Sequence, residues 1–405
     1  MVLALAAALA GCGGTSSPPI TFQHPLTVYS DLPLSGPQGQ LMTSIENGEL
    51  LALDQAHAHR RALDVGLEFL SDAPQGSGWT PSTTQSEARF AAQDADAIAY
   101  IGDFDSGATA ISLSVTNPVD ILQVSPSSPY VGLTNANPID DKGEPGSHYL
   151  GGTRTFARLV PTDVQEARAT VRFMRYMNVA SLYTITDDAP YVSPFDSAIA
   201  PLTALDAPGA GITVVGSSQI NSNSSAQPAS YASLVATIAG SHADAVIVGA
   251  AADPGTEALW QELAQEDPGV KLFAPSTLAT GPFLAALGEA SEAPFVTSPI
   301  LPLDQYPQRS RKVLAAYRRQ FGRPTAYSLY GYEAMSSVLA AIRRAGKHDG
   351  DRLDVVRAYF HLGLRKSVIG RYRISNGGDT SLTRFAGYGV RLGGELKELG
   401  RFSGA

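Results

Sequence analysis

Strand signals and helix signals alternate along this chain in two successive series, and this alternation constrains the fold more than any other feature. The first series predicts strands at 26–30, 65–70, 97–101 and 121–125 and helices at 42–61 and 85–95. The apolar residues of the first helix, such as Ile45 and Leu53, recur at the spacing of one helix face. Strands joined through helices pair in parallel, so this series predicts a doubly wound α/β sheet.

A polar loop rich in proline and glycine, residues 135–152, precedes the second series. This series predicts helices at 164–176, 195–205, 231–239 and 257–265 and strands at 180–185, 212–215, 245–248 and 271–274. The remainder breaks the rhythm, with helices predicted at 308–321, 332–345 and 353–362 and strands at 369–374 and 387–392. This last portion must either pack on both preceding domains or form a domain of its own.

Two serine turns follow neighbouring strands of the first series. Ser106 follows strand 97–101 and opens a helix, and Ser127 and Ser128 follow strand 121–125. Ligands of open α/β sheets bind outside the carboxyl ends of the strands, where helix N-termini offer unpaired N–H groups. With hydroxyl donors beside them, such turns suit a small anionic group such as a carboxylate.

Composition and motifs exclude several other functions. The formal net charge is −9 and no basic patch is present, which argues against nucleic-acid binding. His57 and His59 are two residues apart, so a helix would place them on different faces and no metal site is expected. The chain has no Walker loop and no Gly-x-Gly-x-x-Gly fingerprint, and no cofactor is expected.

The single cysteine, Cys12, follows an apolar, uncharged stretch in the sequence Leu9-Ala-Gly-Cys. A short apolar run that ends in small residues is typical of a secretion signal. Leu-Ala-Gly-Cys resembles a bacterial lipobox, in which the cysteine thiol is acylated after export, and residues 13–19 read as a flexible tether. An incidental cysteine in an apolar N-terminus is the alternative interpretation.

Several collinear stretches resemble the type I periplasmic solute-binding proteins of the branched-chain amino acid group, which serve ABC importers. The stretches that carry the resemblance are 33–37, 47–56, 100–107, 121–134, 156–163, 330–335 and 377–385. The resemblance implies two doubly wound lobes joined by three hinge crossings, with the ligand between them. It divides the chain into a signal and tether (1–25), lobe one (26–155 plus 297–368) and lobe two (156–296 plus 369–405).

The resemblance also implies which residues hold the ligand. Ser106 matches the hydroxyl that binds the ligand carboxylate, and Ser127 and Ser128 match donors of the second turn. Tyr191 matches an aromatic side chain that closes over the ligand from lobe two, and Tyr327 lies where the family often places a pocket aromatic. Each serine could instead be an ordinary helix cap, and each tyrosine a core residue.

Other positions depart from the pattern of amino acid binders. Pro129 replaces a threonine of the second turn, and alanines stand where a lobe-two aromatic is usual. Ser276 replaces the acid that pairs with the ligand ammonium, for which Asp253 is the nearest substitute in the sequence, and Asp187 or Asp188 a further one. A buried ammonium needs a carboxylate partner, so leucine, isoleucine and valine are expected to bind weakly.

The sequence thus predicts an exported, lipid-anchored receptor, not an enzyme, that captures a small organic solute and delivers it to an ABC permease. The solute would be amino-acid-like, an amide or a carboxylate. A sensor domain that regulates a partner is the main alternative. A serine hydrolase is a weaker one, because Phe104-Asp-Ser-Gly lacks the glycine spacing of a nucleophile elbow.

Overall fold

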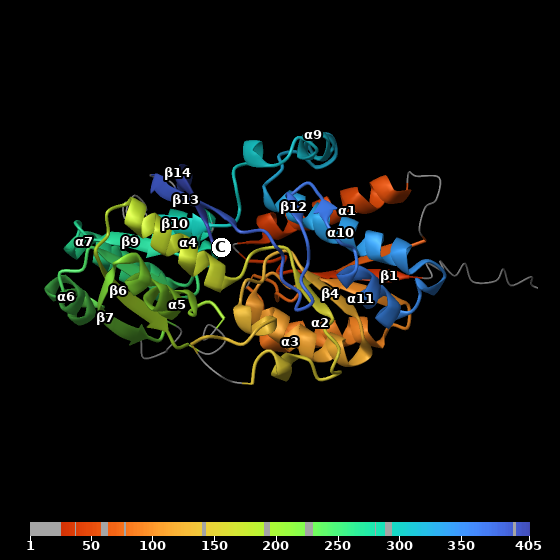
Figure 1. Ribbon diagram of the computed structural model, residues 1–405, viewed down its shortest axis with the longest axis horizontal. Coiled ribbons are helices and arrows are strands. Elements are labelled where there is room, and N and C mark those ends of the chain that lie inside the picture. Colours follow the sequence, from red (N-terminus) through yellow and green to blue (C-terminus); the bar gives the residue numbers. More distant parts are fainter. Residues whose placement is uncertain are drawn as a thin grey trace, which may run out of the picture.

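The computed structural model describes residues 26–36, 38–57, 64–76, 78–139, 143–189, 195–222, 230–279, 281–287, 294–391 and 394–405. These residues form two α/β lobes that lie side by side along the longest axis of the molecule (Figure 1). None of the helices in these ranges is long and apolar enough to cross a membrane.

Lobe one is built on a parallel sheet with the strand order β2-β1-β3-β4-β5. The strands are β1 (Thr27–Asp31), β2 (Gly66–Leu70), β3 (Ala97–Ile101), β4 (Leu122–Ser125) and β5 (Phe156–Arg158). Strands β3 and β4 are fully buried, because helices cover both faces of the sheet. The order of the strands reverses at β1, as in other doubly wound sheets.

The helices of lobe one come from both ends of the chain. They are α1 (Gly39–His57), α2 (Pro81–Gln93), α3 (Ser106–Thr116), α9 (Ser310–Phe321), α10 (Tyr327–Ala345) and α11 (Arg352–Phe360). Helices α1 and α10 approach so closely that a Cβ at Gly48 or Gly331 would collide with the backbone of the other helix. The late helices therefore complete the first lobe.

Lobe two is built on a mixed sheet with the order β14-β13-β10-β9-β8-β6-β7. Its strands are β6 (Ser181–Asp187), β7 (Thr213–Ile220), β8 (Ala245–Gly249), β9 (Lys271–Ala274), β10 (Pro294–Ser298), β13 (Arg384–Arg391) and β14 (Glu395–Ser403). Strands β6 to β10 pair in parallel, and β13 and β14 add an antiparallel edge. The helices are α4 (Asp163–Tyr176), α5 (Ile199–Asp206), α6 (Ala232–Gly240), α7 (Pro254–Glu266) and α8 (Gly281–Ala286).

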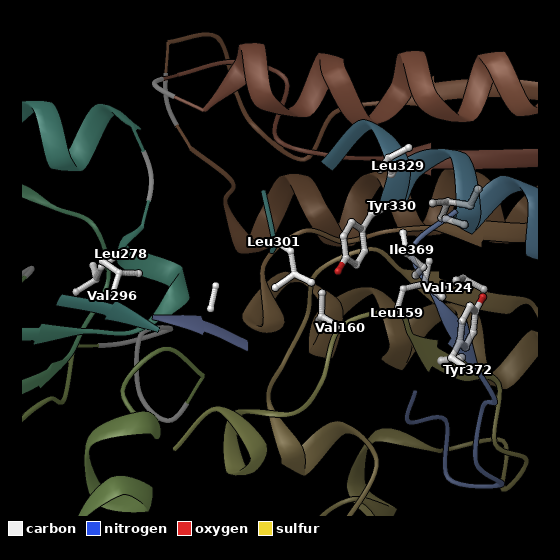
Figure 2. Close-up of a cluster of buried hydrophobic side chains, with 14 of the residues drawn as sticks. Val124, Leu159, Val160, Leu278, Val296, Leu301, Leu329, Tyr330, Ile369 and Tyr372 are labelled. Carbon is white, nitrogen blue, oxygen red and sulfur yellow. The ribbon is translucent and has the colours of Figure 1, made fainter. Parts of the chain in front are cut away.

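The chain passes between the lobes three times, and apolar side chains fill the space around the crossings. It leaves lobe one after β5, returns after β10, and leaves again before β13. Figure 2 shows Val160 and Leu301, on the first two crossings, between the lobe-two residue Val296 and the lobe-one residue Tyr330. All four belong to one continuous hydrophobic cluster. The two lobes therefore share a core at the crossings.

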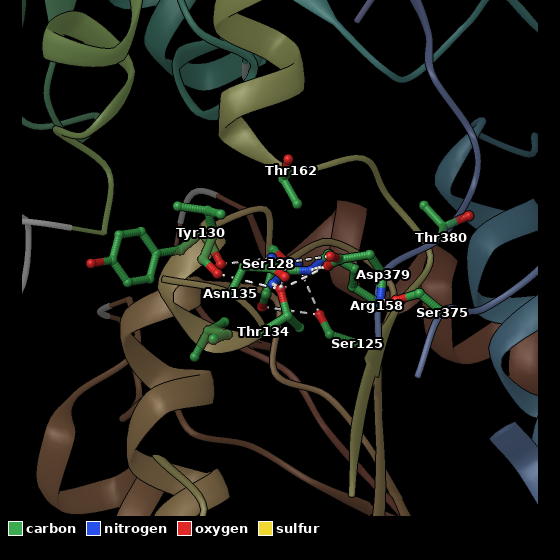
Figure 3. Close-up of polar contacts among 12 residues, drawn as sticks. Ser125, Ser128, Tyr130, Thr134, Asn135, Arg158, Thr162, Ser375, Asp379 and Thr380 are labelled. Carbon is green, nitrogen blue, oxygen red and sulfur yellow. Dashed lines mark hydrogen bonds and ion pairs between the residues drawn. The ribbon is translucent and has the colours of Figure 1, made fainter. Parts of the chain in front are cut away.

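A buried arginine ties the crossings to the second serine turn. Arg158, at the end of β5, donates to the backbone oxygens of Ser128 (2.7 Å) and Tyr130 (2.8 Å) and to Thr134 Oγ1 (2.6 Å). Its Nε lies 3.0 Å from Asp379 Oδ1, an ion pair without hydrogen-bond geometry. Figure 3 shows these partners converging on Arg158 from two separate segments, the second serine turn and the segment of Asp379. The arginine thus fixes the turn relative to the first and last crossings.

The sequence-based elements agree with this fold, and the two-lobed, doubly wound architecture is confirmed. Strands β5, β10 and β14 were not predicted. The strand predicted at 369–374 is reduced to β12 (Arg371–Tyr372), which pairs with β11 (Arg365–Lys366). Tyr372 donates to Glu333 on α10, so this hairpin packs on lobe one.

Candidate functional site

A cavity of about 600 Å³ lies between the lobes, at the carboxyl ends of the lobe-one strands. From lobe one it is lined by Pro33, Ser35, Gln38, Gly78, Trp79 and Asp105, and from lobe two by Asp196, Ala251, Ala252, Glu257, Thr277, Phe283 and Ala286. This is the position where open α/β sheets bind ligands. The volume is within the range of small-molecule pockets.

A smaller inner cavity of about 50 Å³ adjoins the first one. The two share the lining residues Gln38, Asp105, Asp196 and Thr277. The inner cavity is also lined by residues that the sequence singled out: Ser106, Ser127, Pro129, Ser276 and Tyr327. The structure therefore brings both serine turns, the lobe-two serine and the late tyrosine to one site.

Ser106 is the first residue of α3, and its side chain is buried at the inner cavity. Its Oγ accepts a hydrogen bond from the backbone N–H of Tyr130, at 3.2 Å. The hydroxyl hydrogen and the second lone pair of the oxygen remain for a ligand. Ser106 thus has a structural contact in addition to its place on the cavity wall.

The second serine turn is held together by its own hydrogen bonds. The backbone N–H groups of Ser127 and Ser128 both donate to Ser125 Oγ, at 3.1 and 2.9 Å. The Ser128 side chain is fully buried, bonds to Thr109 Oγ1 at 2.6 Å and lines neither cavity. Only Ser127 presents its side chain to the site, and the two backbone donors are already used.

Tyr327 and Ser276 face the inner cavity from opposite lobes. The Tyr327 ring packs on Phe104, with centroids 5.4 Å apart, and burial raises the pKa of its phenol. Ser276 is held by Glu166 on α4, which accepts from the Ser276 N–H (2.6 Å) and hydroxyl (2.7 Å). Burial raises the pKa of Glu166 to about 7. Glu166 was not identified from the sequence, because its partner lies 110 residues away.

The substitute acids suggested by the sequence do not line the site. Asp253 caps helix α7, accepting from the N–H of Thr256 at 2.8 Å, and Asp187 accepts from the N–H groups of Ala189 and Ser222. Glu257, one turn into α7, is the side chain of this segment that reaches the cavity. Asp188 is exposed and also lines neither cavity. Tyr191 lies outside the described residues.

Two aspartates missed by the sequence reasoning face both cavities, one from each lobe. Asp105 is the residue before α3, but its carboxylate makes no capping hydrogen bond, and Asp196 precedes α5 in lobe two. Burial raises the pKa of Asp105 to about 7. The pKa of Asp196 is raised by burial and by the negative charges of Asp105 and Asp187. Asp105 stands next to Ser106 in the turn, which was the available signal.

Trp79 is a further cavity residue that the sequence analysis did not identify. Its six-membered ring packs over Gly107, where a Cβ would lie 2.9 Å from the ring. Glycine at this position therefore lets the indole lie against the start of α3. Among the described residues no group of three or more His, Cys, Asp or Glu side chains is arranged to hold a metal ion.

Comparison with known proteins identifies the class. The profile described as periplasmic binding protein matches residues 32–381, so the chain belongs to the periplasmic binding protein family. Proteins of this family bind solutes outside the cytoplasm and are not enzymes. No curated protein sequence matches the chain significantly.

Solved structures share the fold at low sequence identity. A leucine-binding protein, LivK, from Thermotoga maritima is 16% identical, with a TM-score of 0.74 over 93% of this chain and 99% of that one. LivJ from Streptococcus pneumoniae, in complex with isoleucine, is 14% identical, with a TM-score of 0.72 over 93% and 99% of the two chains. A solute-binding protein from R. palustris, in complex with benzoate, is 17% identical, with a TM-score of 0.71 over 93% and 96%.

Proposed function

We propose that this protein captures a small organic solute between its two lobes and delivers it to an ABC importer. The observation that carries the proposal is the cavity of about 600 Å³, whose walls come from both lobes. Such a site binds ligand most tightly when the lobes close, so that binding and closure are coupled. Membership of the periplasmic binding protein family supports this function.

In this proposal the ligand contacts are Ser106, Ser127 and Tyr327 from lobe one and Ser276 from lobe two. All four line the inner cavity. Tyr191 stays in the proposed site because its position in the sequence precedes Asp196, which lines both cavities. Ser128 has a different part, because its hydrogen bonds hold the turn that carries Ser127.

The lobe boundaries follow from the sheets. We place the first crossing after Arg158 rather than at 155, because β5 pairs with β4 and so belongs to lobe one. We place the second crossing after Ser298 rather than at 296, because β10 ends at Ser298. We place the last crossing after Thr380 rather than at 368, because Tyr372 contacts α10. Residues 1–25 remain the proposed signal and tether, in which Cys12 would carry a lipid anchor that keeps the receptor beside the permease.

The two tryptophans of the chain offer a direct test. Trp79 lines the cavity, whereas Trp260 is fully buried in lobe two. A metabolite library is screened for compounds that raise the melting temperature. Those hits should also change the tryptophan emission, and the change should disappear in Trp79→Phe. Small-angle scattering should show a smaller radius of gyration with a hit at saturation. Hits that bind without changing emission or radius would contradict capture between the lobes.

A further inference from the structure

The charges around the cavity are of one sign. Asp105, Asp196 and Glu257 line it, and among the described residues no lysine, arginine or histidine does. The neighbouring charges that act on Asp105 and Asp196 are also acidic, namely Asp72, Asp103 and Asp187. Among the described lining residues, a carboxylate ligand would therefore find no cationic partner.

The carboxylates of Asp105 and Asp196 have no partner among the described residues and are available to a ligand. Both are half-buried on the cavity walls, and neither side chain forms a hydrogen bond or an ion pair with any described residue. A carboxylate that no protein group occupies can accept hydrogen bonds from a ligand. The two residues come from different lobes and line the same two cavities, so a single ligand group can reach both.

The backbone donors of the expected anion site, by contrast, are occupied. The N–H groups of Ser127 and Ser128 are bonded to Ser125, so an anion would have hydroxyl donors such as that of Ser106 but not these N–H groups. Asp105 adds its own negative charge at the N-terminus of α3, where a ligand anion would otherwise be attracted. Apolar side chains, including Trp79 and Phe283, also line the wall and suit a hydrocarbon or aromatic body.

We propose that the cavity selects a solute with a protonated nitrogen group, an ammonium, amidinium or guanidinium, held between Asp105 of lobe one and Asp196 of lobe two. This inference rests on the proposed function of solute capture. The cation would replace the protons of the two carboxyls, and its charge would join the lobes across the cleft. The Trp79 face adds a surface on which cations bind favourably.

A panel sorted by charge tests the inference. The melting temperature is measured with about 10 mM of each probe. The panel contains cations (agmatine, 2-phenylethylamine, choline), zwitterions (leucine, phenylalanine), anions (benzoate, phenylacetate) and neutral compounds (acetamide, 2-phenylethanol). The cationic set should give the largest increase. A larger increase with benzoate or phenylacetate would overturn the inference but leave solute capture intact, and no increase with any probe would count against both.

The best cationic probe is then titrated by calorimetry into variants. Asp105→Asn and Asp196→Asn should each weaken binding on the order of tenfold or more. Asp54→Asn, which removes an exposed charge on α1, should leave the affinity unchanged. Circular dichroism shows whether each variant is folded. Unchanged affinity in both folded cleft variants would refute the assignment.

The pH dependence of the affinity distinguishes ligand contact by Asp105 and Asp196 from a purely structural role of these residues. Because the carboxyls must lose protons to hold a cation, affinity should rise between about pH 6 and pH 8 and protons should be released. Calorimetry in two buffers with different ionisation heats measures that release. Proton uptake, or affinity that falls over this range, would indicate an anionic ligand and overturn the proposal.

Discussion

Replacement of Arg158 by methionine should destabilise the protein strongly. The guanidinium is fully buried and serves three acceptors at 2.6–2.8 Å besides its ion pair with Asp379. Removing one partner of a buried charge pair costs about 3–5 kcal/mol. The Asp379 side chain is 21% exposed, so water solvates part of the charge left behind. We therefore expect a loss near the lower end, about 3 kcal/mol.

Urea denaturation monitored by circular dichroism measures this loss of unfolding free energy. For a domain of about 150–250 residues, each kcal/mol lost lowers the melting temperature by about 2–4 °C, so a thermal scan should show a decrease of roughly 10 °C. Arg401→Met is the matched control, because Arg401 is 59% exposed and pairs with Glu398 on the surface. It should cost less than about 0.5 kcal/mol. A loss in Arg158→Met no larger than in this control would show that our reading of the network is wrong.

Four further predictions follow. Glu49→Met should stabilise the protein by about 1–3 kcal/mol, since both Glu49 carboxylate oxygens are buried on α1 and the neighbouring Ser30 hydroxyl makes no well-formed hydrogen bond to them. Denaturation should show a gain that the exposed control Gln40→Met lacks. Gly331→Ala should cost about 2 kcal/mol or more because α1 blocks the new methyl group, whereas Gly240→Ala, in open space, should change stability by less than about 1 kcal/mol. Burial raises the pKa of several carboxyls to about 7, so the folded state holds more protons than the unfolded state between about pH 4 and pH 7. The melting temperature should therefore rise as the pH is lowered from 8 to about 5.5. A melting temperature that stays constant or falls as the pH is lowered would contradict this. Cys12→Ser should move the exported protein from the membrane to the soluble fraction, because stable anchoring needs acyl chains; a mature protein that mass spectrometry finds unacylated at this cysteine would rule out the anchor.

The sequence predicted the fold well because its main signal is local. Buried parallel strands such as β3 and β8 are short apolar runs between helices, and their order along the chain implies the layers. The strands that were missed depend on distant partners. β5 has three residues, and β14 is half exposed at a sheet edge, so neither stands out from its surroundings.

The candidate site was predicted in part. The turn positions of Ser106 and Ser127 follow from where strands end, and both line the cavity. The local sequence does not show whether a hydrogen-bond donor is already used. Ser125 accepts from the N–H groups of the second serine turn, and Glu166, on α4, accepts from Ser276. The acids that the sequence offered as ammonium partners, Asp253 and Asp187 or Asp188, lie after β8 and at the end of β6 in lobe two. The structure instead brings Asp105 and Asp196 together across the cleft.

The contact between α1 and α10 also bears on how the chain is made. The first lobe is finished only when residues 327–345 are available, and the second only when β13 and β14 join its sheet. A polypeptide that stops after β10 would lack part of both lobes. Folding during synthesis would therefore stay incomplete until nearly the last residue, which favours a chain still unfolded when it reaches an export channel.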